Sequence, residues 1–183
     1  KAIKPSEKKR VAFHEAGHAT ISWLVEHAAP LLKVTIVPRG RSLGAAWYLP
    51  EERSLTTTEQ MLDEMCATLG GRAAEEVAFG NISTGALSDL ERVTKQAQAM
   101  VTIYGLSENI GNISYYDSSG QSEYSFGKPY SEETAKVIDT EISKLIEEQY
   151  ERAIHLLETN KEKLTQIADI LIEREVIFKD DLE

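Results

Sequence analysis

The segment His14-Glu15-Ala16-Gly17-His18 contains the residue types and the spacing that could carry out a reaction. Residues four apart on a helix share one face, with Cβ atoms about 5–6 Å apart, so the two imidazoles can bind one cation. Glu15 would then lie beside that cation. The pattern H-E-x-x-H is typical of zinc hydrolases, in which zinc lowers the pKa of a bound water to about 7 and the Glu takes its proton. We therefore predict a zinc site with Glu15 as general base.

The alternative is a pair of core histidines whose ring nitrogens are satisfied inside an apolar helix. A random chain of this length would contain H-E-x-x-H on the order of once in a few hundred cases, which favours the metal site. Pro5 and Ser6 predict the start of the helix, with Ser6 as N-cap. Gly17 within it indicates either the close approach of another backbone or of substrate, or simply a tolerated glycine.

The remaining metal ligand must be distant in sequence. Metzincins place Gly three and His six residues after the second His, but Ile21 and Leu24 occupy those positions here. His27 is too far along the same helix to close the site, and a carboxylate is the better candidate. Three carboxylates lie on or near the inward faces of predicted helices, and spacing alone does not choose among them: Glu75, Glu76 and Asp89.

Two short strands are expected after the first helix. Residues 34–37 are β-branched and predict a buried strand, and residues 44–49, followed by Pro50, predict an edge strand. An edge strand can pair with an extended peptide through main-chain hydrogen bonds, although an ordinary edge strand is the simpler interpretation. The candidate substrate-binding residues are Gly44, Ala45, Ala46, Trp47 and Tyr48.

The rest of the chain is predicted to be mainly helical. A capping box at Thr56 with Glu59, or at Thr57 with Gln60, begins a helix that runs to Gly80. The next helix carries Asp89 at its inward, N-terminal end. We expect a catalytic part over about 1–105, an irregular loop over 106–130 with a short strand at 112–116, and a helical hairpin over 131–175.

Composition narrows the class of protein. At 183 residues and 42% hydrophobic, the chain can bury one core, and its net charge of −10 argues against nucleic acid as a partner. The single cysteine, Cys66, excludes a thiolate zinc site of the C-x-x-C type. Gly127-Lys128 precedes Pro129 instead of Ser or Thr, so no nucleotide site is expected. The first residue, Lys1, is neither an initiator Met nor part of a signal peptide, which indicates a fragment of a longer polypeptide.

Four segments in order along the chain resemble the peptidase domain of the FtsH family, the membrane-anchored AAA+ zinc metalloproteases of peptidase family M41. They are His14–His18, Pro38-Arg39-Gly40 with Leu43-Gly44, Gly70–Glu76, and Ser83–Leu90. The resemblance covers essentially the whole chain. Leu87-Ser88 is the one departure, because many members have other small or polar residues there.

The resemblance implies a mainly α zinc-peptidase domain with a small β-sheet near the active site. It implies that Asp89 is the third ligand of one Zn²⁺ per chain, and that Glu75 orients a ligand imidazole. It also implies a homohexamer, with transmembrane and ATP-using AAA+ regions upstream of this chain. Substrates would be unfolded, damaged, short-lived or membrane proteins. The domain would face the cytoplasm at a bacterial inner membrane, or lie at a mitochondrial or chloroplast membrane.

Two rival functions remain to be separated from this one. Peptide deformylase also uses H-E-x-x-H, but its Cys ligand precedes the His pair, whereas Cys66 follows it. A catalytically inert member of the same family would keep the hexameric scaffold without hydrolysis. Such a member would be expected to lack Glu15 or a ligand, and none is missing here.

Overall fold

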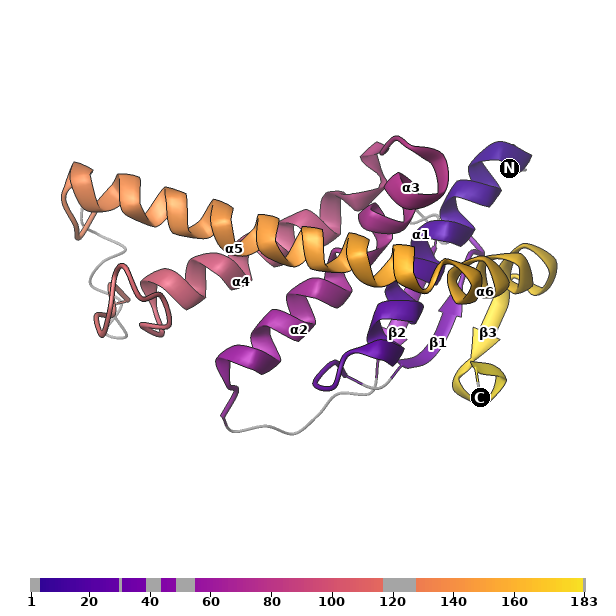
Figure 1. Cartoon of the computed structure of the whole chain (residues 1–183), viewed down its shortest axis with the longest axis horizontal. Coiled ribbons are helices and arrows are strands. Elements are labelled where there is room, and N and C mark those ends of the chain that lie inside the picture. Colours follow the sequence, from indigo (N-terminus) through magenta and orange to yellow (C-terminus); the bar gives the residue numbers. More distant parts are fainter. Residues whose placement is uncertain (1–3, 30, 39–43, 49–54, 117–127, 183) are drawn as a thin grey trace.

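Helices make up most of the chain that the structure describes. The computed structural model covers residues 4–29, 31–38, 44–48, 55–116 and 128–182. The helices are α1 (Pro5–Leu24), α2 (Thr58–Thr68), α3 (Gly70–Phe79), α4 (Leu87–Thr102), α5 (Glu132–Thr159) and α6 (Lys161–Arg174), with short 3₁₀ turns η1 (Thr84–Ala86) and η3 (Lys179–Leu182) (Figure 1). The prediction of a mainly helical fold is confirmed.

Helix α1 is the central element. Its N-cap is Lys4 and Pro5 occupies the first turn, so the predicted cap at Ser6 is wrong. Proline suits this position because its fixed φ is helical and its missing N–H would have no partner there. Every residue from Ala12 to Ile21 is buried. The helix packs against α3 on one side and α6 on another, so the His-Glu segment lies inside the protein.

Two glycines explain how closely α1 approaches α3. A Cβ added to Gly17 would lie 2.2 Å from the carbonyl oxygen of Gly70, and one added to Gly70 would lie 2.8 Å from the carbonyl oxygen of Gly17. No side chain larger than hydrogen fits at either position without movement of the backbone. Of the interpretations offered for Gly17, the structure supports the close approach of another backbone, that of α3 at Gly70.

The helix predicted to run to Gly80 is two helices. Helix α2 begins with the capping box of Thr57 and Gln60, as the sequence predicts, but ends at Thr68. Leu69 joins it to α3, which begins with two glycines, where helix propensity is weakest. Gly80 ends α3 in the left-handed conformation, with φ of 73°. The break allows these glycines to face α1.

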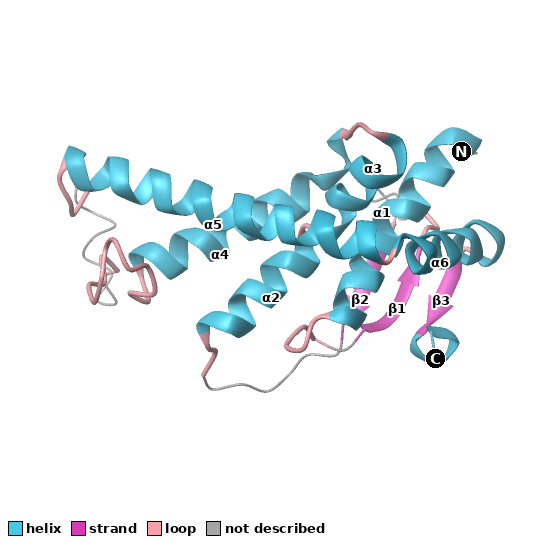
Figure 2. Cartoon of the chain, in the orientation of Figure 1, coloured by secondary structure: helices cyan, strands magenta, loops and turns pink. Residues whose placement is uncertain are grey.

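Three strands form an antiparallel sheet in the order β2-β1-β3: β1 (Leu31–Thr35), β2 (Ala45–Tyr48) and β3 (Val176–Phe178). Figure 2 shows them grouped at one side of the helical body. Strand β1 begins three residues and ends two residues before the predicted strand at 34–37, and β3 is unexpected. Strand β2 pairs with one strand among the described residues, as expected for an edge strand. The predicted strand also included Leu49, which lies outside the described residues.

The irregular segment after α4 contains no strand at 112–116, so that prediction is wrong. The N–H of Tyr115 donates instead to the carbonyl of Thr102, at the end of α4. Residues 117–127 lie outside the described part of the chain. Helices α5 and α6 follow with only Asn160 between them, and α6 packs chiefly on α1. Among the described residues, no helix combines the length and the apolar character that crossing a membrane requires.

Candidate metal centre

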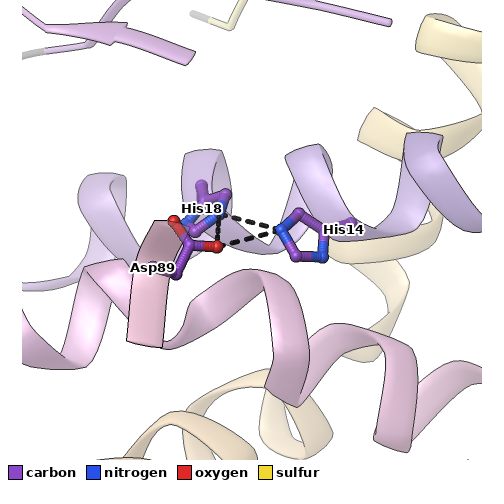
Figure 3. Close-up of side chains that lie close together, drawn as sticks. All are labelled: His14, His18 and Asp89. Atoms are coloured by element: carbon purple, nitrogen blue, oxygen red, sulfur yellow. Dashed lines mark hydrogen bonds and ion pairs between the residues drawn. The ribbon is translucent and has the colours of Figure 1, made fainter. Parts of the chain in front are cut away.

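Three side chains from two helices converge on one point. The Nε2 atoms of His14 and His18 are 3.3 Å apart, and each lies 3.1 Å from Oδ2 of Asp89. The histidines lie on adjacent turns of α1, and Asp89 lies in the first turn of α4 (Figure 3). In the described part of the chain, these residues form the one group of His, Cys, Asp or Glu whose atoms are close enough to hold a metal ion.

The other nitrogen of each ring fixes its orientation. Nδ1 of His14 lies 2.8 Å from Oε2 of Glu75, and Nδ1 of His18 lies 2.9 Å from the carbonyl oxygen of Ala67. Both oxygens accept hydrogen bonds, so each Nδ1 carries a hydrogen. In a neutral ring the Nε2 atom then presents a lone pair. Two such lone pairs and a carboxylate oxygen then face one another, and a cation between them, either a proton or a metal ion, stabilises the arrangement.

Negative charge around the His14 and His18 rings also favours a cation at this point. Burial opposes a charge on His14, but hydrogen bonds to Asp89 and Glu75 raise the pKa of the imidazole to about 10. Burial likewise opposes a charge on His18, and its hydrogen bond to Asp89 raises the pKa of that ring. For Asp89, contact with both rings outweighs burial and lowers the pKa of the carboxyl. A site that attracts protons this strongly also attracts a dication, and two imidazoles with one carboxylate match the ligands that zinc takes in hydrolases.

Glu15 is buried next to this cluster on α1. Burial raises the pKa of its carboxyl, although the two histidines oppose the shift. A Cβ added to Gly44 would lie 3.0 Å from Cγ of Glu15, so the residue just before β2 packs directly against this side chain. A desolvated carboxylate with a raised pKa is better suited to take a proton near neutral pH than an exposed one.

Of the three candidate carboxylates, the structure brings only Asp89 to the Nε2 atoms. Glu75 is almost completely buried and contacts the opposite side of the His14 ring. Burial disfavours its charge, but hydrogen bonds from His14, Ser83 and Arg10 lower the pKa of Glu75 to about 2. The side chain of Glu76 accepts a hydrogen bond from the hydroxyl of Tyr150 and does not join the cluster.

Gly71 makes room for the His14 ring. A Cβ at this position would lie 2.3 Å from Nε2 of His14. The sequence gave no reason to link Gly71 to the imidazole. Arg10 and Ser83, which donate to Glu75, and Asn81, which accepts from Arg10, were also not identified. Arg10 lies more than sixty residues from its partners, and Asn81 and Ser83 lie in the loop after α3, so no helical periodicity marks them.

The predicted substrate strand lies beside the cluster. Its Tyr48 hydroxyl is 3.4 Å from Oγ of Ser22, which lies one turn after His18 on α1. Burial raises the pKa of Tyr48 to about 12, and the charges of Glu15 and Asp89 add to the shift. Trp47 lies on another side of the strand, with Nζ of Lys33 4.5 Å from its ring centroid.

Comparison with known proteins gives consistent results along the whole chain. The model of peptidase family M41 matches residues 1–183. The chain is 63% identical to an "ATP-dependent zinc metalloprotease FtsH" of Parabacteroides distasonis over 183 residues, all of this chain and 27% of that protein. It is 58% identical to a protein of the same name from Karelsulcia muelleri over 179 residues, 98% of this chain and 29% of that protein.

A more distant relative is the "Mitochondrial inner membrane m-AAA protease component AFG3L2" of Mus musculus. It is 50% identical over 180 residues, which cover 98% of this chain and 22% of the mouse protein. The chain thus spans less than a third of the length of these relatives.

Proposed function

Because this chain belongs to peptidase family M41, we propose that it is a zinc-dependent endopeptidase whose site is the cluster of His14, His18 and Asp89. The observation that carries the proposal is the convergence of two imidazole Nε2 atoms and one carboxylate oxygen within 3.3 Å of one another. Nε2 of each histidine and the Asp89 carboxylate would hold the ion. Bound zinc supplies a Lewis acid that polarises a carbonyl and eases the deprotonation of water.

Glu15 is the general base of the proposed reaction. Its carboxylate takes the proton of the attacking water and then delivers it to the leaving amine. The burial that raises its pKa makes the carboxylate a stronger base for the first of these transfers. Glu75 holds the hydrogen on Nδ1 of His14, so that Nε2 is kept free for the metal.

The substrate is proposed to bind as an extended peptide along β2. Gly44, just before this strand, packs against Glu15, and the strand has one paired neighbour among the described residues. Pairing with its other edge would bring a peptide carbonyl to the site by main-chain hydrogen bonds, with little dependence on side-chain identity. Peptides N-methylated on alternate amides should therefore be cut more slowly than unmodified ones.

We place this activity within a larger protein. The two FtsH relatives are named as ATP-dependent and are more than three times as long as this chain. The chain is accordingly proposed to be the proteolytic part of a homohexameric, membrane-anchored AAA+ protease that degrades unfolded, damaged or membrane proteins. Its higher identity to the two bacterial FtsH proteins than to the mouse mitochondrial one supports a bacterial membrane. We propose that the domain lies on the cytoplasmic face of a bacterial inner membrane.

The test is Glu15→Gln, measured by zinc content and by cleavage of an unstructured peptide. Loss of a general base is expected to slow hydrolysis by about 10²–10⁴-fold while zinc stays bound. Glu26→Gln removes the same charge from an exposed carboxylate on the segment after α1 and should change neither quantity. Full hydrolysis by the Glu15 variant would exclude the mechanism. Zinc binding without any cleavage by the unmodified chain would favour the inert-scaffold alternative.

A further inference from the structure

Arg10 connects the metal-binding helix to the segment that leads to Asp89. It lies on α1 one turn before His14, and its Nη1 donates to Oε1 of Glu75 at 2.9 Å. Nη1 also lies 3.4 Å from the carbonyl oxygen of Asn81, and Nη2 donates to Oδ1 of Asn81 at 2.5 Å. The guanidinium carbon lies 4.6 Å from the ring centroid of Phe79, at the end of α3. One side chain thus contacts α3 and the loop after it.

Glu75 contacts Arg10, the ligand His14 and the loop that leads to Asp89. Its Oε2 holds Nδ1 of His14, whereas its Oε1 accepts from Arg10 and, at 2.6 Å, from Oγ of Ser83. Oγ of Ser83 in turn accepts from the N–H of Gly85 and caps η1, which continues directly into α4 and Asp89. The same buried carboxylate therefore contacts a ligand imidazole and the connection that carries the third ligand.

We propose that Arg10 is a positioning residue of the metal centre, which fixes the separation between the His pair and Asp89 through Glu75 and Asn81. This inference rests on the proposed function, namely that the cluster binds zinc. Without Arg10, Oε1 of Glu75 would keep one of its two donors, and the amide oxygen of Asn81 would lose its ion contact. Both the carboxylate and the loop could then shift, because buried charges with missing partners rearrange to recover them.

If Arg10 acted only through its charge, its removal would change the zinc affinity in the opposite direction. Arg10 is a cation close to the site, and like charges repel, so its removal alone would tighten the binding of a dication. A positioning role predicts weaker binding. The direction of the change in zinc affinity therefore separates the two roles, which a measurement of peptide hydrolysis would not do.

The experiment is the zinc affinity of Arg10→Gln, measured in competition with a chromophoric chelator. We expect about tenfold weaker binding, at the lower end of the range for residues that support metal ligands. Lys8→Gln is the matched control, because it removes one positive charge from the same helix and breaks only an ion pair with Glu175. It should bind zinc as tightly as the unmodified chain. Unchanged or tighter binding by Arg10→Gln would overturn the inference.

A double variant tests whether Arg10 acts through Glu75. Glu75→Gln is expected to weaken zinc binding by about 10–100-fold. Arg10→Gln should then add little in that background, whereas additive losses would contradict the inference. Circular dichroism of the metal-free variants monitors folding. If Arg10→Gln fails to fold, Arg10→Lys serves instead, because it keeps the charge but lacks the fork that contacts Glu75 and Asn81 together, and it should still weaken binding.

Failure of this inference is distinguishable from failure of the proposed function. An unmodified chain that binds no stoichiometric zinc would overturn both. An unmodified chain that binds zinc tightly, together with an Arg10→Gln variant that binds it equally well, would overturn the inference alone.

Discussion

The metal centre and the apolar cluster between α2, α4 and α5 hold their helices together by different means. At the metal centre, polar side chains and glycines set the distances, since Glu75 bonds α1 to the loop before α4 and Gly71 makes room for an imidazole. The apolar cluster is built from large side chains with almost no exposure. Its fully buried members are Met65, Leu69, Val93, Ala97 and Met100.

Helix α4 belongs to both regions and shows what the difference means. Its first turn presents Asp89 to the histidines, and its later turns bury Val93, Ala97 and Met100 in the apolar cluster. Apolar packing has no preferred direction, because it follows from the area removed from water and from many weak contacts. A metal centre is directional, because each ligand distance is fixed to within tenths of an ångström. The cluster therefore anchors α4, and the polar network sets its final position.

The largest expected effect concerns the metal centre. Zinc at about a thousand times its dissociation constant should stabilise the chain by about 4 kcal/mol, because it binds the folded form selectively. His18→Ala should abolish the gain, whereas His155→Ala, on the exposed face of α5, should retain it. Urea unfolding with and without zinc measures both. An equal gain in the His18 variant would mean that zinc binds elsewhere.

A substitution in the apolar cluster is expected to lower the stability of the fold without changing the zinc affinity. Met100→Ala removes a side chain that is 1% exposed and should lower the free energy of unfolding by about 3 kcal/mol. Zinc affinity, measured with the chelator, should be unchanged because the ligands remain positioned by the polar network. Gln98→Ala on the exposed face of α4 is the control. A large loss of zinc affinity in the Met100 variant would show that packing, not the network, sets the position of Asp89.

The apolar region was the more predictable one from sequence. Helices such as α4 and α5 repeat large residues every three or four positions, and this periodicity is a local property. The break at Leu69 was not predicted because the apolar helical periodicity continues across it, and glycine within a helix does not by itself end the helix. In the structure, the two glycines after the break contact α1. Strand β3 was missed because three residues carry too little pattern, and their pairing depends on the distant β1.

The metal centre was only partly predictable. The spacing of His14 and His18 gave one helix face, but Asp89, Glu75 and Glu76 were equal candidates until the family resemblance favoured Asp89. The structure separates them geometrically, since one carboxylate faces the Nε2 atoms, one faces Nδ1 and one faces neither. Arg10 could not be found by spacing, because its partners belong to other elements.

The smallest expected effect tests whether a disturbance at the start of α2 reaches the metal centre at its other end. Thr57→Ala removes the capping box at the start of this helix and should cost about 1 kcal/mol. Thr56→Ala, one residue earlier and exposed, should stay within about 0.5 kcal/mol of the unmodified chain. The carbonyl of Ala67, which accepts from His18, lies near the opposite end of α2. Fraying of the first turn should therefore leave zinc affinity unchanged, and a parallel loss of affinity would mean that α2 transmits the disturbance to the His18 ring.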